Sequence, residues 1–289
     1  ETMLIPLFIA NPLPEMVLSV YRNAGFDLLI ATTEAEQKAL FETRGNDIHA
    51  ALTNGFVGFS RAQMDALPYL EIVSVIGVGY ENVDLAAAKE KKIMVTNGPN
   101  TNTDSVADHA IALLLAISRD IVNDNAAVKE KGLWDEARHL RPAVSGKKIG
   151  VLGLGKIGEA IARRAAKGFE MQVGYHNRHP KPNYPYQYFE SIVDLAKWAD
   201  YLVIAMPGGA ETRFLVNSQV LNALGPKGFL INIARGSIVD TNAMVEALQT
   251  EQIAGAAIDV IDGEPEVLQS IRHLDNLIIT PHSAASSPE

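Results

Sequence analysis

Three polar residues of different chemistry, Arg235, Glu264 and His282, each follow a short apolar run that predicts a buried β-strand. A histidine can donate a proton at neutral pH, a carboxylate beside it stabilises its charged form, and a guanidinium binds a carboxylate through two parallel hydrogen bonds. Taken singly, each residue is explained as well by an ordinary surface or loop position. Because parallel strands end at a common edge of their sheet, the three together predict an acid–base site at that edge.

A glycine-rich segment earlier in the chain predicts the kind of ligand that binds beside this site. It follows a short apolar run and opens a helical pattern in which Ile157, Ile161 and Ala165 recur at four-residue spacing. A second apolar run, residues 171–175, completes a β-α-β unit. In this context the glycines form a dinucleotide-binding fingerprint, because they allow a tight turn, a close approach of pyrophosphate and close packing of helix on strand. We expect six residues to bind the phosphates of a dinucleotide: Gly153, Leu154, Gly155, Lys156, Ile157 and Gly158.

Residues 3–98 alternate short apolar runs with helical patterns, which predicts a parallel sheet with helices on both faces. We expect strands at residues 4–10, 26–30, 50–53, 71–76 and 93–95, and helices at residues 13–23, 33–43, 60–67 and 84–91. Two loops, Thr53-Asn54-Gly55 and Gly77-Val78-Gly79, follow strands at the edge where open α/β sheets bind ligands. By themselves, their glycines are better explained as turn residues.

The chain from residue 99 onward repeats this alternation and predicts a second domain. Asn97-Gly98-Pro99-Asn100 predicts a crossover between domains, and one long helix is expected from Asp104 or Ser105 to about Lys131. Later strands are expected at residues 201–205, 229–233, 253–260 and 277–280, and helices at residues 191–198, 218–224 and 242–249. The predicted fold class is α/β, with two doubly wound parallel-sheet domains. A flavodoxin-like substrate domain would hold residues 1–98 plus 283–289, and a Rossmann dinucleotide-binding domain would hold residues 99–282.

Composition excludes several classes of function. The 289 residues carry a formal net charge of −9, which disfavours nucleic-acid and anionic-membrane partners. No apolar run reaches the length of a membrane span, and no basic segment precedes an apolar one as in a secretory signal. The absence of cysteine rules out disulfides, thiolate catalysis and cysteine-ligated metals, and it fits a cytoplasmic protein. No metal site is predicted.

Five segments of the chain carry a family resemblance: residues 232–240, 255–265, 280–282, 76–84 and 105–110. These segments are distributed over nearly the whole chain. In them, the chain resembles the D-isomer-specific 2-hydroxyacid dehydrogenase family. Within that family, residues 175–178 and 206–213 are most similar to the NADPH-dependent glyoxylate/hydroxypyruvate reductases. The family continues beyond the histidine motif with a helix that returns to the first domain, and here residues 283–289 follow that motif.

The resemblance implies an enzyme that reduces small 2-oxo acids, glyoxylate and hydroxypyruvate, to D-2-hydroxy acids by hydride transfer. His282 would protonate the oxygen that becomes an alkoxide, and Glu264 would keep His282 protonated. Arg235 would bind the substrate carboxylate and stabilise the developing negative charge. The backbone N–H groups of Val78 and Gly79 would bind the other side of that carboxylate. Further cofactor contacts are implied for Met206, Pro207, Thr212, Ile233, Ala234 and Asp259, the last of them to the nicotinamide amide.

The cofactor preference is predicted from the residues that follow the run at 171–175. NAD enzymes of this fold carry Asp or Glu about 20 residues beyond the glycines, where the carboxylate accepts hydrogen bonds from the ribose hydroxyls. Here the position holds Asn177 and Arg178, an amide that can donate and a guanidinium that can pair with the 2′-phosphate of NADP. NADPH is therefore the expected cofactor. The alternative is that Arg178 is a solvated charge and that NADH is used as well.

The helical pattern at residues 106–121 is apolar around most of its circumference, which predicts a homodimer built through the coenzyme domain. His109 in this helix is expected to be a satisfied core or interface residue rather than a catalyst. Trp134 lies where some family members reach into the partner's active site, but packing within the chain is the favoured interpretation.

Two alternatives to the reductase stay open at this point. Within the family, the chain resembles 3-phosphoglycerate and other D-2-hydroxyacid dehydrogenases, although no extra basic residues for a substrate phosphate can be located. From another class, a non-catalytic dinucleotide-sensing regulator is compatible with the motifs, because some relatives are transcriptional corepressors. Loss of NADPH absorbance on adding glyoxylate or hydroxypyruvate distinguishes an enzyme from a regulator.

Overall fold

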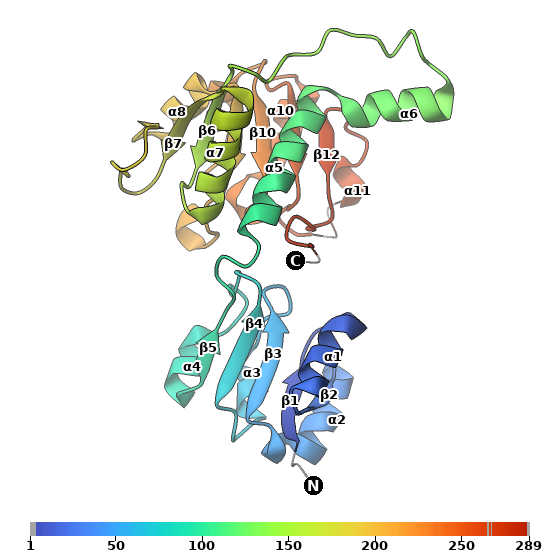
Figure 1. Cartoon of the computed structure of the whole chain (residues 1–289), viewed down its shortest axis with the longest axis vertical. Helices are drawn as coiled ribbons and strands as arrows, with labels where there is room; N and C mark the ends of the chain where they lie inside the picture. Colours follow the sequence, from blue (N-terminus) through green and yellow to red (C-terminus); the bar gives the residue numbers. More distant parts are fainter. Residues whose placement is uncertain (1–3, 265, 267, 288–289) are drawn as a thin grey trace. The chain divides into compact units, whose positions relative to one another are not determined.

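The chain forms two compact units that divide between Asn102 and Thr103. They are seen in a computed structural model (Figure 1), which describes residues 4–264, 266 and 268–287. Each unit has its own parallel sheet and its own hydrophobic core. The α/β class with two parallel-sheet domains is therefore confirmed.

The first unit is a five-stranded parallel sheet with the strand order β2-β1-β3-β4-β5. The strands are β1 (Ile5–Ile9), β2 (Phe26–Ile30), β3 (Ala50–Asn54), β4 (Ile72–Ile76) and β5 (Met94–Thr96). The helices are α1 (Glu15–Asn23), α2 (Glu34–Arg44), α3 (Arg61–Asp65) and α4 (Leu85–Lys91), with a 3-10 turn η1 (Gly45–Asp47). Leu7 and Leu18 bury one face of the sheet against α1, and Phe8, Met64 and Ala87 bury the other face against α3 and α4. This is the strand order of a flavodoxin-like sheet.

Short polar residues determine where these helices begin. The Thr33 hydroxyl accepts the Glu36 N–H while the Glu36 carboxylate accepts the Thr33 N–H, which is a capping box at the start of α2. Ser60 and Gln63 form the same arrangement before α3. Such caps satisfy N–H groups that have no partner inside the helix, and each stabilises its helix by about 1 kcal/mol.

The second unit is a seven-stranded parallel sheet with the order β12-β11-β10-β9-β6-β7-β8. Its strands are β6 (Lys148–Leu152), β7 (Gln172–His176), β8 (Gln187–Tyr188), β9 (Tyr201–Ile204), β10 (Phe229–Asn232), β11 (Gly255–Ile258) and β12 (Leu277–Ile279). Its helices are α5 (Thr103–Ser118), α6 (Ile121–Lys131), α7 (Lys156–Phe169), α8 (Ile192–Trp198), α9 (Ser218–Leu224), α10 (Thr241–Gln249) and α11 (Leu268–Ile271). Two 3-10 turns, η2 (Ala210–Thr212) and η3 (Gly236–Ile238), follow β9 and β10. The order reverses direction between β6 and β9, which is the switch point of a Rossmann sheet.

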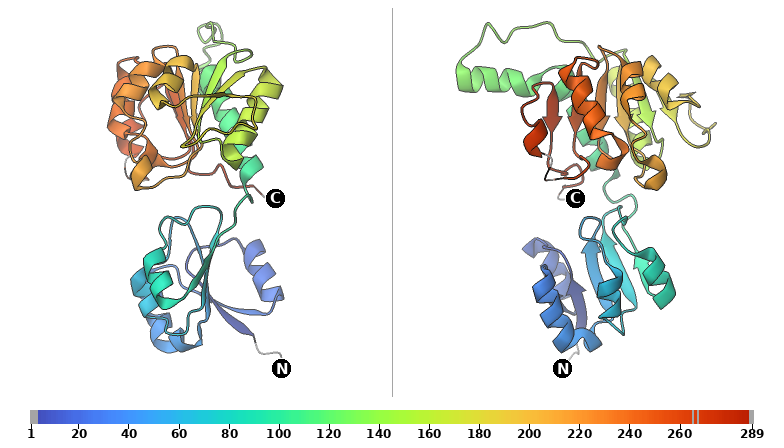
Figure 2. Two further views of the ribbon diagram at one scale, coloured as in Figure 1. Left: turned by 90° about the vertical axis from the view of Figure 1, so that its left-hand side faces the viewer. Right: turned by 180° about the vertical axis from the view of Figure 1, so that it is seen from behind.

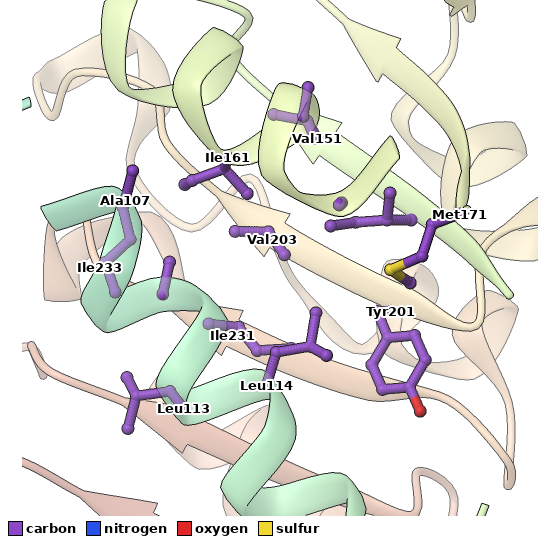
Figure 3. Close-up of a cluster of buried hydrophobic side chains, with 14 of the residues drawn as sticks. Ala107, Leu113, Leu114, Val151, Ile161, Met171, Tyr201, Val203, Ile231 and Ile233 are labelled. Carbon is purple, nitrogen blue, oxygen red and sulfur yellow. The ribbon is translucent and has the colours of Figure 1, made fainter. Parts of the chain in front are cut away.

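Both faces of this sheet are buried, because alternate strand residues point to opposite sides. Val151 and Val203 belong to the cluster that α5 and α7 cover, and Leu152 and Leu202 belong to the cluster that α8, α9 and α10 cover. Figure 2 shows the helices on either side of the strands. Figure 3 shows the first cluster, in which Leu114 of α5 lies among buried side chains from the strands.

The single helix expected to run to about residue 131 is wrong, because the chain forms two helices there. Asp120 has a φ of 54°, a left-handed conformation that interrupts the helix between α5 and α6. Arg141 fixes this turn, since its guanidinium pairs with Asp120 at 2.6 Å and with Asp124 at 3.1 Å. α6 and the loop after it project from the sheet as an arm, residues 121–140 (Figure 1).

The apolar residues of α5 are largely accounted for inside the second unit, where Val106, Ala107, Ala110, Leu113, Leu114 and Ile117 are buried. On the arm, by contrast, four large apolar side chains are exposed: Ile121, Val122, Trp134 and Leu140. Trp134 is 64% exposed, so little of it packs against this chain. Among the residues that the structure describes, no helix combines the length and the apolar character that crossing a membrane requires.

Residues 283–287 belong to the second unit, whereas the sequence led us to expect them in the first. The N–H groups of Ser283 and Ala284 donate to the Asp259 carboxylate at 2.9 Å each, and the Ser105 hydroxyl donates to the Ala284 carbonyl at 2.7 Å. These bonds, rather than sequence position, decide where the segment lies. The elements β8 and α11 were not expected, because two to four residues are too few to show a periodicity.

Candidate active site

Six strands of the second sheet end at the same level, which lines up the residues that follow them. Leu152 pairs with both His176 and Ile204, and Ile258 pairs with both Asn232 and Ile279. The residues that come next along this carboxyl edge are Gly153, Asn177, Ala205, Ile233, Asp259 and Thr280. The predicted cofactor and catalytic segments of this unit therefore meet at one edge.

The glycine turn after β6 has almost no room for side chains at two of its glycines. Gly153 has a φ of +93°, and a Cβ there would lie 2.7 Å from the Cα of Met206. A Cβ on Gly158 would lie 2.0 Å from the Gly153 carbonyl oxygen. A Cβ on Gly155, by contrast, would meet no described atom within 4 Å. The glycines thus close the turn on itself and leave open space at Gly155.

The N-terminus of α7 opens into that space. Gly155 is the N-cap residue and provides no side-chain cap, and among the described residues no acceptor is recorded for the N–H groups of Lys156 and Ile157. Free N–H groups and the positive end of a 14-residue helix suit a phosphate. These residues fit the pyrophosphate of a dinucleotide, as the sequence predicts.

The loop after β7 is tied to the glycine turn by side chains. The Asn177 Oδ1 accepts the Leu154 N–H at 2.7 Å, and the Lys181 ammonium donates to the Leu154 carbonyl at 2.5 Å. Arg178 is 82% exposed at its side chain and pairs with Glu211 at 3.5 Å. Because Asn177 accepts through its oxygen, its amide N–H groups can donate to a ligand. Lys181, which the sequence reasoning did not select, adds a second cation beside this turn.

Arg235 projects from a turn that the chain holds tightly. The buried Asn232 side chain accepts the Ala234 N–H and donates to the Arg235 carbonyl, both at 3.0 Å. A Cβ on Gly236 would lie 2.0 Å from the Ile261 carbonyl carbon, and one on Gly208 would lie 2.8 Å from Arg235 Cγ. Gly236 thus has no room for a side chain beside the main chain, and a side chain at Gly208 would press on the stem of Arg235. The Arg235 guanidinium donates to the Ala234 carbonyl at 2.7 Å. Ile233 and Ala234 are buried beside it.

His282 and Glu264 form a close pair at the ends of β12 and β11. The Nδ1 of His282 lies 2.6 Å from Glu264 Oε1, and the Ile261 N–H donates to Oε2 at 2.9 Å. Burial opposes ionisation of Glu264, but the hydrogen bonds from His282 and Ile261, with the charges of His282 and Arg235, outweigh it and hold the pKa of Glu264 below its ordinary value. An ionised Glu264 fixes the proton of a neutral His282 on Nδ1.

Asp259 is 2% exposed and holds the loop that carries His282. Its Oδ1 accepts the Thr280 hydroxyl at 2.5 Å and the Ser283 N–H at 2.9 Å, and its Oδ2 accepts the Ala284 N–H at 2.9 Å. The predicted contact of Asp259 with the nicotinamide amide stays a prediction. In the structure, the Asp259 carboxylate holds the loop that carries His282 in place. The hydroxyl of Thr212, another predicted cofactor residue, donates to the carbonyls of Pro207 and Gly209 and so closes its own turn.

Val78 and Gly79 lie in the first unit, in the loop that follows β4. Gly77 has a φ of +91°, the Asn97 amide donates to the Val78 carbonyl at 2.8 Å, and a Cβ on Gly55 would lie 2.6 Å from the Gly79 carbonyl. Among the described residues no acceptor is recorded for the N–H groups of Val78 and Gly79. The loop is therefore fixed by its carbonyls while its donors stay available to an anion.

Sequence reasoning missed the residues that hold the catalytic turns. Asn232 and Gly236 lie inside the quoted motif beside Arg235, so the motif could have drawn attention to them. Gly208 also lies inside a segment that carries the resemblance, residues 206–213, but its role depends on where the Arg235 side chain passes, which the sequence does not show. In the described part of the chain, no group of three or more His, Cys, Asp or Glu side chains could hold a metal ion.

A family model described as the NAD-binding domain of D-isomer specific 2-hydroxyacid dehydrogenases matches residues 111–284. The chain belongs to this family. Glyoxylate/hydroxypyruvate reductase A of Arabidopsis thaliana is 41% identical over 265 residues, which cover 91% of this chain and 84% of that protein. Hydroxyphenylpyruvate reductase of Plectranthus scutellarioides is also 41% identical, with the same coverage.

The solved structures agree with this membership. An NADPH-dependent glyoxylate/hydroxypyruvate reductase from Sinorhizobium meliloti, in complex with NADP and malonate, superposes with a TM-score of 0.89 at 36% identity. The match covers 98% of this chain and 88% of that chain. The family and the fold that the sequence indicated are both confirmed.

Glu264→Gln tests the ionised pair without an assay of activity. Because the pKa of Glu264 is lowered on folding, its stabilising contribution is fully present above the ordinary value of 4.5 and is lost as the pH falls through the lowered folded value. We expect the unmodified protein to withstand more urea than Glu264→Gln at pH 6, and the difference to vanish at acid pH, where protonated Glu resembles Gln. Urea midpoints followed by near-UV circular dichroism measure this. A difference that does not change between pH 6 and acid pH would contradict an ionised Glu264.

Proposed function

We propose that the protein reduces small 2-oxo acids with NADPH, converting glyoxylate to the achiral glycolate and hydroxypyruvate to the D-2-hydroxy acid. The observation that carries this proposal is the 2.6 Å pair of His282 and Glu264, on the same sheet edge as the dinucleotide turn. An acid beside a nicotinamide site is what reduction of a ketone requires. Membership of the family and the activities for which its relatives are named support the same choice.

Each residue of the site has its own role in the reduction of the carbonyl group. The glycine turn at residues 153–158 and Asn177 would hold the reduced dinucleotide, which when bound would supply a hydride to the carbonyl carbon. His282 gives its Nε2 proton to the oxygen as the carbonyl becomes a hydroxyl, and the Glu264 carboxylate stabilises the imidazolium that must exist beforehand. Arg235 binds the substrate carboxylate and stabilises negative charge on the reacting oxygen. By family resemblance, the N–H groups of Val78 and Gly79 are the expected partners of a substrate carboxylate.

A larger substrate is a second candidate. Phe56 and Tyr80 are 56% and 45% exposed, and they flank the loop that carries Val78 and Gly79. The Asn82 amide donates to the Gly55 and Phe56 carbonyls, which ties the backbone of Phe56 to the segment that follows Tyr80. Together with the likeness to hydroxyphenylpyruvate reductase, this favours testing 4-hydroxyphenylpyruvate alongside the small oxo acids.

His282→Asn should abolish reduction while leaving NADPH binding intact. Removing a general acid costs roughly 10²–10⁴-fold in rate. Loss of NADPH absorbance with glyoxylate, hydroxypyruvate and 4-hydroxyphenylpyruvate measures turnover, and fluorescence titration measures NADPH affinity. His273→Asn, an exposed histidine beyond α11, is the matched control and should behave as the unmodified protein. Unchanged turnover in His282→Asn would remove the residue from the mechanism, and an inactive unmodified protein would favour the regulator.

Arg235→Lys should lower kcat/KM by about 10²-fold, because lysine keeps the charge but loses the planar pair of donors that a carboxylate needs. Steady-state kinetics with hydroxypyruvate measures this, and the exposed Arg272→Lys provides the control. Near-normal kinetics in Arg235→Lys would mean that another group binds the substrate carboxylate.

NADPH should be preferred over NADH in the unmodified protein. The exposed Arg178 and the donor end of Asn177 suit a 2′-phosphate, and a tenfold preference needs only about 1.4 kcal/mol. The double variant Asn177→Asp with Arg178→Ala should swing the kcat/KM ratio toward NADH, while Arg163→Ala on the exposed side of α7 should leave it unchanged. A ratio at or below unity in the unmodified protein would contradict the assignment.

We infer a homodimer from the arm rather than from α5. Ile121, Val122, Trp134 and Leu140 are exposed on the arm, and Leu140 is fully so. The arm is braced at its base by Arg141, so it can present this apolar surface to a second copy without first becoming ordered. Light scattering at micromolar concentration should give twice the chain mass, and Trp134→Ser with Leu140→Ser should shift it toward the monomer. A monomeric unmodified protein would overturn the inference.

A further inference from the structure

His109 of α5 faces the loop that carries His282, although its helix lies far from that loop in sequence. The His109 Nε2 is 2.9 Å from the Thr280 hydroxyl and 3.6 Å from Asp259 Oδ1. The His109 side chain is 24% exposed and the Asp259 carboxylate only 1%. None of the catalytic or cofactor roles described above uses this histidine.

The protons in this cluster can be placed by counting donors. Thr280 has one hydroxyl proton, and it donates that proton to Asp259 Oδ1 at 2.5 Å. The Thr280 oxygen must therefore accept from His109, which places a proton on Nε2. The result is a directed chain in which His109 donates to Thr280 and Thr280 donates to Asp259.

The other bonds of Asp259 belong to the loop itself. Its carboxylate accepts the N–H groups of Ser283 and Ala284, and its carbonyl accepts the His282 N–H at 2.9 Å. His282 has a φ of 52°, a left-handed conformation that is uncommon for a residue with a Cβ. Its N–H is held by the Asp259 carbonyl and, at 3.0 Å, by the Thr280 carbonyl, and both of these residues are within reach of His109.

We propose that His109 is a positioning residue for His282. By donating to Thr280 it fixes the hydroxyl that holds Asp259, and Asp259 then keeps the loop at 280–284 in the conformation that points His282 at Glu264. Ser105, one helical turn earlier in α5, anchors the same loop through the Ala284 carbonyl. The proposal rests on the proposed function, because it assigns no chemistry to His109 and requires His282 to be the acid.

The test replaces the donor in two ways. His109→Leu removes the donor, whereas His109→Gln keeps an N–H at a similar reach. We expect His109→Leu to lower kcat by about tenfold or more, since small misplacements of a catalytic group are costly, with NADPH affinity unchanged. His109→Gln should stay within about threefold of the unmodified protein, and His273→Leu is the matched control. Hydrogen exchange of the peptide holding Ser283 and Ala284 should quicken in His109→Leu and not in His109→Gln.

Thr280 provides an independent check, because Thr280→Val breaks the same chain and Thr280→Ser preserves it. The double variant His109→Leu with Thr280→Val should lose no more kcat than the worse single variant. Normal kcat in His109→Leu, equal losses in Leu and Gln variants, unchanged hydrogen exchange or additive losses would each overturn the proposal. An inactive unmodified protein would instead overturn the proposed function, and this role with it.

Discussion

The constraint on which the second unit depends is the common end level of its parallel strands. Strands joined by helical crossovers all point the same way, so their carboxyl ends share one edge. Here the register aligns Leu152, His176, Ile204 and Ile258, and each loop beyond them contributes one part of the site. A one-residue slip of a single strand would turn its side chains to the opposite face and move its loop away from the others.

The sequence predicted this architecture because strands buried on both faces are written as short continuous apolar runs ended by glycine or polar residues. The prediction from sequence failed where no glycine or proline marks the end of a helix. The segment Ser118-Arg119-Asp120 contains neither glycine nor proline, yet Asp120 adopts a left-handed conformation and ends the helix. That turn is held by Arg141, a partner that lies 21 residues further along the chain and that no local pattern can reveal.

The catalytic residues of the candidate site could be predicted from the sequence, but the residues that hold them in place could not. Arg235, Glu264 and His282 could be selected because each follows a strand and each suits one part of the chemistry. The hydrogen bonds that aim them come from Asn232 and Asp259, and these bonds exist only once the backbone has its turns. Asp259 shows the difficulty, since family resemblance points to the nicotinamide while both of its oxygens accept bonds from the loop of His282.

Close packing of backbone on backbone explains why this support is rigid. Gly153 and Gly236 lie so near neighbouring main chain that a single methyl group would displace it, and these contacts cannot adjust by changing a rotamer. At His282, by contrast with these glycines, a residue with a side chain adopts a left-handed conformation. Glycine would adopt that conformation freely but has no imidazole, so the site accepts local strain in exchange for an acid. At Gly153 and Gly236, close packing holds the backbone in place. At the loop of His282, hydrogen bonds to the buried Asp259 carboxylate hold the backbone instead.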